Sequence, residues 1–403
     1  RNKQNAIIAS NDDGPASTDP RLEFTVPADQ ETLELTVRDN LDLAGTAAIY
    51  RLVVTAVDSP LRLFEVAMKS DTINVASRES AVLEVFALRQ AYDGPIQLQF
   101  DNLPVGVVAT GVEIPAGMNG SLVTFTNNGE GLAPTVIRAN ARSADGTITQ
   151  PIHVETTPDD RSPSWMREQL AIANTPKSTA PFVATIVNEA ALPQLAMASK
   201  PTMAVKLVRP PNTFGPVRLS LVTSQPVIKV NGQPNLPQMI RAEKPVEIPV
   251  DNTVKATGDA LIAADKALAD AVKLSQSAQG DAKVAADAKV EELKGKRTMA
   301  ETALREAEAK AVYQTDYAMF VPSTLAENQY DISVRAELLN PERNVVLRTT
   351  WTPVRRIPSL NPLVIKLAGP APLEAMLDPK TGVVAKVTGT IERLAGYTGD
   401  VTL

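Results

Sequence analysis

The chain contains no cysteine, a single histidine and few aromatic residues, which make up 4% of its 403 positions. The absence of cysteine excludes disulfides, thiol catalysis and the common cysteine-based zinc sites. It fits a reducing compartment, and it fits equally well a bacterial exported protein that does not rely on disulfides. Cysteine content therefore leaves the compartment open.

The single histidine, His153, lies in a run that is typical of an edge strand. A Ser-His-Asp arrangement or a multi-histidine metal site needs more residues than this chain offers. Carboxylate pairs for glycoside cleavage stay open, because such pairs have no fixed spacing in sequence. We expect no enzymatic activity and no cofactor in this segment, while a catalytic domain outside it stays open.

The chain also lacks a basic stripe and a long apolar run. Its formal net charge is −6, and the charges of both signs are spread along it, whereas binding to phosphate backbones requires clustered Lys and Arg. No apolar run approaches the roughly 20 residues that cross a bilayer. We expect no nucleic-acid partner and no membrane span in this segment.

The most informative feature that is present is a short motif that occurs three times. It consists of an aromatic residue near a turn glycine, followed by an alternating apolar strand, and the copies are Tyr92–Leu98, Phe214–Leu219 and Tyr397–Leu403. Such recurrence predicts tandem modules. The 31 prolines between Val- and Ile-rich runs favour many short strands. We predict a mainly β fold of about three to four tandem β-sandwich domains.

The spacing of strand-like runs divides the chain into residues 1–58, 59–157, 158–357 and 358–403. The first part contains three alternating runs at 22–27, 32–37 and 50–54. The second contains a complete set at 61–66, 81–88, 95–100, 122–126, 135–141 and 148–154. The third is a second complete module, and the fourth is a truncated one. Because Leu403 falls inside a motif copy, we expect the chain to be part of a longer protein.

Residues 1–58 carry a pattern of turns and strands of moderate specificity. Its elements are Asp13-Gly14, Asp19-Pro20, the strand Phe24 to Pro27, a loop with Asp39, and the strand Tyr50 to Leu52. This pattern resembles the closing half of a bacterial pre-peptidase C-terminal (PPC) module. The resemblance implies a jelly-roll-like β-sandwich that accompanies secreted bacterial proteins.

Some members of that family hold calcium with acidic loops, which makes Asn11, Asp12, Asp13 and Asp19 the candidate metal ligands. Hard cations need six to eight converging oxygens, and clustered Asp and Asn side chains supply several of them. The alternative is a solvated, Asx-rich turn. A melting temperature that does not change with chelator would exclude the calcium site.

The segment Leu103-Pro104-Val105-Gly106-Val107 follows the first copy of the motif. It resembles the Leu-Pro-x-Gly-Val turn of bacterial immunoglobulin-like surface modules, which implies immunoglobulin-like sandwiches for the complete modules. Such a turn needs Pro to fix φ and Gly to take a positive φ, so it has a structural cause. Tyr92 is interpreted as a core or corner aromatic and not as a ligand platform.

The second complete module contains a large insertion. Gly94 and Arg138 are 44 positions apart, whereas Gly215 and Arg335, in corresponding runs, are 120 apart. From Ala256 to Val312 the chain is rich in Ala, Lys, Asp and Glu and has no proline, with a break at 275–281. We predict two antiparallel helices that form an Ala-seamed coiled-coil hairpin. The expected seam residues are Leu261, Ala264, Leu268, Ala271 and Val272, facing Ala285, Ala288, Leu293, Ala300, Leu304, Ala307 and Ala311.

The hairpin has two possible roles. Small seam residues bury little area, so the hairpin needs support from its host, a neighbouring copy or a partner, which favours an assembly contact. The alternative is a tolerated surface insertion, because long loops add little closure entropy. Balanced charges disfavour a helix that lies on a membrane.

Two stretches connect or follow the modules. Residues 157–181 indicate a linker or an added strand, with a short helix at 164–173. Residues 358–403 are expected to form strands at 363–367 and 384–393, with a turn at 378–382 between them.

The succession of modules, with Pro-Val-Arg-Arg at 353–356, is similar to large exported proteins of planctomycete-type bacteria. The resemblance implies a secreted, periplasmic or cell-surface location. One predicted function is a non-catalytic structural or adhesive protein that self-associates or binds protein partners, as in a filament or layer, through edges, loops and the hairpin. The other is an accessory part of a large exported hydrolase that binds polysaccharide or protein. With two Trp and six Tyr, the chain has few aromatics for a carbohydrate platform.

Overall fold

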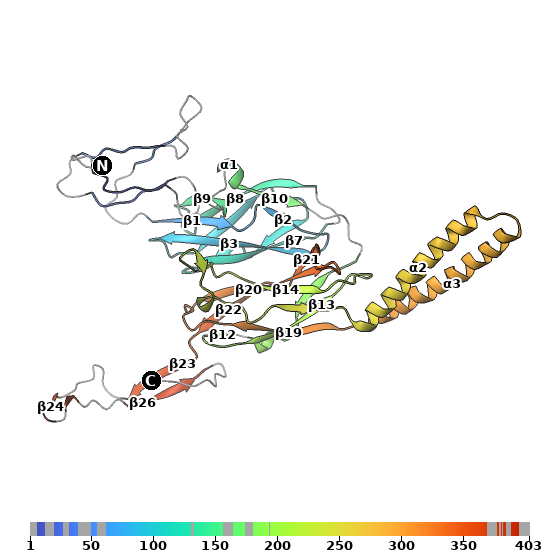
Figure 1. Ribbon diagram of the computed structural model, residues 1–403. Coiled ribbons are helices and arrows are strands. Elements are labelled where there is room, and N and C mark those ends of the chain that lie inside the picture. Colours follow the sequence, from blue (N-terminus) through green and yellow to red (C-terminus); the bar gives the residue numbers. More distant parts are fainter. Residues whose placement is uncertain are drawn as a thin grey trace. The chain divides into compact units, whose positions relative to one another are not determined.

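The computed structural model describes most of the chain and divides it into two compact units. The described residues are 6–12, 20–26, 32–38, 50–54, 62–129, 133–155, 164–173, 180–192, 194–368, 377–378, 380, 382–383 and 388–394. One unit comprises Arg1–Arg78 with Val82–Thr175, and the other comprises Glu79–Ala81 with Pro176–Leu403. Each unit contains a β-sandwich, and we call these the first and the second sandwich (Figure 1).

The first sandwich has two sheets. One has the order β1 (Leu63–Met68), β3 (Ser80–Gln90), β7 (Gly120–Asn127) and β5 (Val107–Thr110). The other has the order β2 (Thr72–Asn74), β10 (Gln169–Ala173), β8 (Thr135–Ser143), β4 (Ile96–Asp101) and β6 (Glu113–Ile114). Strand β9 (Thr149–Val154) pairs antiparallel with β8 and parallel with β1, so it joins the two sheets. A short helix, α1 (Ser164–Arg167), precedes β10.

The second sandwich repeats this order. One sheet contains β11 (Val183–Ile186), β13 (Thr202–Val208), β19 (Tyr313–Phe320) and β17 (Arg241–Ala242). The other contains β12 (Leu195–Ala196), β22 (Arg355–Leu360), β20 (Gln329–Leu339), β14 (Val217–Thr223) and β18 (Val246–Ile248), while β21 (Val346–Trp351) pairs with β20. Smaller elements are η1 (Glu189–Ala191), the pair β15 (Lys229–Val230) and β16 (Gln233–Pro234), and η2 (Leu236–Gln238).

The matching strand orders confirm the prediction of tandem β-sandwiches. In both sandwiches the strand after the motif pairs antiparallel with the same late strand, β4 with β8 and β14 with β20. Leu98 lies opposite Ala141, and Leu219 lies opposite Ala336. The register therefore equates Arg335 with Asn140, two positions from the Arg138 with which the sequence spacing matched it. A shift of two keeps the same face of the strand inward.

The insertion replaces one turn of the shared fold. In the first sandwich, β6 and β7 are joined by the short connection at 115–119. In the second, the equivalent strands β18 and β19 are joined through α2 (Asn252–Ser277) and α3 (Asp281–Lys310). These helices lie side by side as a hairpin (Figure 1). The predicted helical hairpin is thus confirmed, and it starts slightly earlier than expected.

The first sandwich shows how the alternating pattern builds a core. Strand β1 buries Phe64, Val66 and Met68 and turns the intervening residues outward. Tyr92 is 3% exposed and its ring lies 5.3 Å from that of Phe64. Its hydroxyl donates a hydrogen bond to the carbonyl of Pro95 at 2.7 Å. Gly106 takes a φ of +88°. Both the core position of Tyr92 and the positive φ of Gly106 were predicted.

Three predicted strands in the first segment are not observed. The described stretches 20–26, 32–38 and 50–54 form no strand. Their apolar side chains are exposed, as for Leu35 at 54% and Val54 at 79%. An alternating pattern shows which face a strand would bury, but a strand also requires a neighbouring backbone with which to pair. The PPC resemblance therefore stays a prediction.

The limits of the sandwiches differ from the expected ones. Strand β10 pairs with β8 and β2 and so belongs to the first sandwich. The expected boundary at 157 is therefore too early. Only 164–167 of the helix expected at 164–173 is helical, because the rest of that stretch is this strand. Likewise β22 completes the second sandwich and extends beyond the expected boundary at 357. The sequence did not reveal these last strands because each is separated from its partners by a long connection.

After the second sandwich, β23 (Leu363–Ala368) pairs antiparallel with β26 (Thr388–Arg393), and β24 (Leu377–Asp378) with β25 (Gly382–Val383). These pairs correspond to the predicted strands and to the predicted turn between them. The third copy of the motif, Tyr397–Leu403, lies outside the described residues.

Candidate interaction site on the helical hairpin

The hairpin is the main feature that distinguishes two otherwise matching sandwiches, so it is the candidate functional site. At its start the side chain of Asp251 caps α2 by accepting the backbone N–H of Thr253 at 2.8 Å and of Val254 at 3.2 Å. The turn between the helices contains Gly280 at φ +59°, with no atom near the place a Cβ would take. Capping and a positive-φ glycine account for the start and the reversal of the hairpin.

The seam follows a heptad pattern, with alternating spacings of four and three. Its positions are Val254, Gly258, Leu261, Asp265, Leu268, Val272 and Ser275 in α2, and Ala286, Val290, Leu293, Arg297, Ala300, Leu304, Ala307 and Ala311 at and just beyond α3. Most of the predicted seam is confirmed. Ala285 and Ala288 are exposed while Ala286 and Val290 are buried, so these two predictions are wrong, and the partly buried Ala264 and Ala271 lie beside the heptad positions. Alanines surround this part of α3 on several faces, so alanine alone did not indicate the inward face.

Polar pairs occupy part of the seam. The guanidinium Nε of Arg297 donates to Oδ1 of Asp265 at 2.7 Å, and its Nη1 donates to Oε2 of Glu301 at 3.0 Å. The hydrogen bond to Asp265 raises the pKa of Arg297 above its usual value. Closer to the tip, the hydroxyl of Ser275 donates to the carboxylate of Asp287. Polar residues at seam positions select one register at some cost in stability.

The base of the hairpin is built into the apolar packing of its host. Val254, Leu304 and Ala307 form a buried cluster, against which Phe214 packs together with Val250, Leu261 and Ala311. Phe214 is the aromatic residue of the second motif copy. A Cβ added at Gly258 would lie only 2.2 Å from Cε1 of Phe214, so glycine permits this close approach. The hairpin and the motif of the second sandwich therefore share one cluster.

Arg209 holds the same junction from the sandwich side. Its guanidinium lies 4.8 Å from the centre of the Tyr313 ring, at the first residue of β19 after the hairpin. It donates to the carbonyls of Thr213, at 3.2 Å, and of Gly215. Burial lowers the pKa of Arg209. This arginine therefore ties the motif turn to the strand that leaves the hairpin.

The sequence analysis missed these arginines, although a signal for them exists. In the first sandwich Arg89 donates to the carbonyls of Tyr92, at 3.4 Å, and Gly94, at 2.5 Å. In both sandwiches an arginine thus lies close to the end of the strand before the motif, Arg89 within β3 and Arg209 directly after β13, and binds the carbonyls of the turn. Arg393 precedes Tyr397 at a similar spacing in the third copy. The motif is better described with this arginine included.

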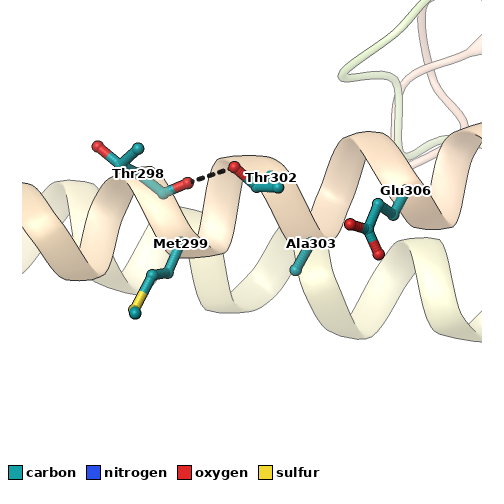
Figure 2. A pocket seen from close by; sticks show the side chains of 5 residues that line it. All are labelled: Thr298, Met299, Thr302, Ala303 and Glu306. Carbon is teal, nitrogen blue, oxygen red and sulfur yellow. Dashed lines mark hydrogen bonds between the residues drawn. The ribbon is translucent and has the colours of Figure 1, made fainter.

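The exposed face of α3 carries a shallow hollow of about 320 Å³ (Figure 2). It is lined by Thr298, Met299, Thr302, Ala303 and Glu306. The hydroxyl of Thr302 donates to the backbone carbonyl of Thr298 at 3.0 Å. Met299 is 75% exposed, as are other large apolar side chains of the hairpin to similar degrees, such as Leu274 at 67% and Val284 at 71%. The hollow offers contact area but contains no catalytic arrangement.

The calcium candidates lie apart from the hairpin. Asn11 and Asp12 are described, and the side-chain amide of Asn11 donates to the backbone carbonyl of Arg21 at 2.6 Å. Asp13 and Asp19 lie outside the described residues. Within the described part of the chain, no group of three or more His, Cys, Asp or Glu is placed to hold a metal ion. The calcium site stays a prediction.

The remaining sequence candidates also stay separate. His153 lies in β9 opposite Ala67 of β1 and is partly buried, as a structural strand residue would be. In the residues that the structure describes, neither of the long helices is apolar enough to cross a membrane.

Comparison with known proteins gives little further guidance. No protein-family model matches the chain, and neither does any curated protein sequence. Among solved structures, the chain is similar to domains 1–6 of the surface layer protein SbsC, with 12% sequence identity and a TM-score of 0.22. The match covers 49% of this chain and 25% of that one. A TM-score this low does not establish a shared fold.

Proposed function

We propose that this chain is a non-catalytic structural segment of an exported bacterial protein, at the cell surface or in the extracellular matrix. In this proposal immunoglobulin-like sandwiches act as spacers, and the hairpin makes contacts between copies. The observation that carries the proposal is the shared cluster of Val254, Leu304 and Phe214 at the base of the hairpin. A merely tolerated loop needs no such junction with its host, whereas an arm that transmits load or fixes a contact does.

Two properties of the hairpin support a contact role. Small or polar residues occupy eight of its fifteen seam positions, namely four alanines with Gly258, Ser275, Asp265 and Arg297, so the seam buries little apolar area for its length. Its free end is therefore expected to gain stability from a neighbour. The exposed Met299 and the hollow beside it supply apolar surface for such a neighbour.

The experiment is to replace residues 249–312 by the sequence 115–119, which makes the equivalent connection in the first sandwich. We expect the variant to keep its β circular-dichroism signal and to lose self-association in sedimentation velocity and electron microscopy of the full chain. Self-association equal to that of the unaltered chain would overturn the proposal.

A second variant protects this test against misfolding of the junction. It keeps the base cluster and replaces only residues 262–303 with a short Gly-Ser turn, which removes Met299 and Ala303 of the hollow but leaves Val254, Phe214 and Leu304 in place. Loss of association in both variants supports a contact through the hairpin. If the long deletion unfolds the second sandwich, the short one alone decides.

A further inference from the structure

A second heptad row runs along α3 beside the seam. Its members from Glu292 to the end of α3 are Glu292, Lys296, Met299, Ala303, Glu306 and Lys310, and all of them are exposed. The same spacing continues toward the tip through Lys289 and Ala285, which the contact described below leaves outside. Their spacing alternates between four and three, the spacing that keeps one stripe of a helix facing a partner helix. Three of the five residues that line the hollow belong to this row (Figure 2).

The row is complementary to itself when it is read in the opposite direction. Reversal about position 301 places Glu292 against Lys310. It also places Lys296 against Glu306, and Met299 against Ala303. In a two-fold contact between identical surfaces, residue i faces j and residue j faces i, so each of these pairs forms twice. A parallel alignment in register would instead place Lys against Lys and Glu against Glu.

We propose that this row of α3 binds the same row of α3 in a second copy of the chain, antiparallel and about a two-fold axis near position 301. The inference rests on the proposed function, because it names the surface by which the hairpin self-associates. Met299 is the apolar anchor and enters the space left by the small side chain of Ala303 in the second copy. The charged pairs lie on either side of this centre and set the direction and register of the contact.

The charges of the row are accessible for such pairing. Lys296 Nζ lies 2.6 Å from Glu292 Oε1, with side chains 59% and 48% exposed. Lys310 Nζ lies 3.9 Å from Glu306 Oε2, with side chains 81% and 66% exposed. Exposed pairs of this kind contribute little to the stability of one helix, so they rearrange at low cost into pairs between copies.

A single contact of this width is expected to be weak. One helix-to-helix interface falls below the roughly 1,200 Å² of a standard stable complex. Each chain has one such hairpin, so the two-fold contact joins two copies only. In a layer or filament, other contacts would hold the copies together and raise the effective concentration at the α3 contact.

A charge swap tests the register. Positions 296 and 306 are ten residues apart, about 15 Å along a helix, so these side chains do not meet within one chain. We expect Lys296→Glu and Glu306→Lys each to weaken self-association about tenfold, measured by sedimentation velocity of the full chain. The double variant should restore it, because the swapped charges face each other again.

Lys294→Glu is the matched control. Lys294 is on the same helix outside the row, with a side chain 55% exposed, close to the 59% of Lys296. It should leave association unchanged, and circular dichroism should show equal helix content in all variants. No effect of the single changes, or no restoration in the double variant, would overturn the α3 contact.

The outcomes separate this inference from the proposed function. If removal of the hairpin abolishes association while the charge swap does not restore it, the hairpin acts through another face and only the α3 contact is wrong. If removal of the hairpin changes nothing, both are wrong.

Discussion

The two sandwiches use the same motif for different purposes. In the first, Tyr92 is buried against Phe64 and its hydroxyl bonds the backbone of its own turn. In the second, Phe214 has no hydroxyl and packs against the base of the hairpin at Gly258. By the strand register Phe214 corresponds to Asp93 and Thr213 to Tyr92. The aromatic residue of the second copy therefore lies one position later in the motif, where it contacts the insertion and not the core position of Tyr92.

The contacts of the motif arginine differ less between the two sandwiches than those of the motif aromatic. Arg89 and Arg209 both donate to the carbonyls of the motif turn. Arg209 additionally covers Tyr313, which follows the hairpin. The turn itself is thus the constant part of the module, and its surroundings adapt. Variants of matched positions in the two sandwiches can separate these parts.

The largest expected difference concerns the glycines of the motif. A Cβ at Gly215 would lie 1.8 Å from the backbone carbonyl oxygen of Leu339, whereas one at Gly94 would lie 2.7 Å from the hydroxyl of Tyr92. Backbone cannot yield as a side chain does, so Gly215→Ala should destabilise the second sandwich by about 3 kcal/mol, and Gly94→Ala the first by about 1 kcal/mol. Urea unfolding followed by peptide-level hydrogen exchange measures each sandwich separately. Equal costs would show that the two turns are packed alike.

The next largest effect concerns a charged pair in the ladder between β20 and β22. The matching ladder of the first sandwich, between β8 and β10, has no charged pair at the corresponding position. Asp331, 2% exposed, receives two hydrogen bonds from Arg356, at 2.7 and 3.0 Å. The corresponding ladder position in the first sandwich pairs Val136 with Ala171. Asp331→Asn should cost about 2 kcal/mol, because it leaves the partly buried Arg356 uncompensated.

A double variant sharpens this comparison. Asp331→Val combined with Arg356→Ala copies the apolar pair of the first sandwich and should recover most of the loss, as urea unfolding would show. A double variant as unstable as the single one would mean that the pair is required for the second sandwich itself.

Two glycines of the hairpin should respond in opposite directions. Gly258 contacts Phe214, whereas a Cβ at Gly295 would meet nothing within 4 Å. Gly295→Ala should stabilise the hairpin by about 1 kcal/mol through helix propensity. Gly258→Ala gains the same propensity but forces the Phe214 ring to move, so it should destabilise by about 1 kcal/mol net. Thermal melting of the helical circular-dichroism signal gives both signs, and a stabilising Gly258→Ala would mean that the junction is loose.

The smallest effect is electrostatic and belongs to the hairpin alone. Hydrogen bonds from Lys289 and Lys296 lower the pKa of Glu292 to about 2. A carboxylate with a lowered pKa contributes stability above its ordinary pKa, and that contribution is lost as the pH falls toward 2. The carboxyl resonance of Glu292 should titrate near pH 2, and Lys289→Gln should move its midpoint upward. A titration midpoint near 4.5 in the unaltered chain would show that the two lysines do not stabilise the ionised form of Glu292.

The sequence predicted much of this architecture, for physical reasons that are easy to name. Alternation gave the strands that bury one face, as in β1 with Phe64, and the abrupt composition change gave the hairpin. Prediction from the sequence failed where a strand pairs with partners that are distant in the chain, as for β10 and β22. It also failed in the first segment, where an alternating pattern around Leu35 is present without a paired neighbour.

The candidate site was only partly predictable. The location of the hairpin in the second module followed from sequence spacing. The role of Phe214 did not, because the motif suggested a core aromatic like Tyr92. Only the close approach at Gly258 reveals that the ring turns toward the insertion. The mixed charges of α3 indicated only that the helix does not lie on a membrane, because the outward-facing row follows from the seam positions that the structure shows.

Amide hydrogen exchange along α2 tests the central claim that the hairpin is built into its host. If the base cluster anchors it, protection should be highest around Val254–Leu261, lower in the middle, and lowest at 277–281 near the tip. Phe214→Ala should remove the protection at the base first. An isolated, tolerated hairpin would instead fray from its base and be most protected in its middle. That pattern, unchanged by Phe214→Ala, would contradict the account.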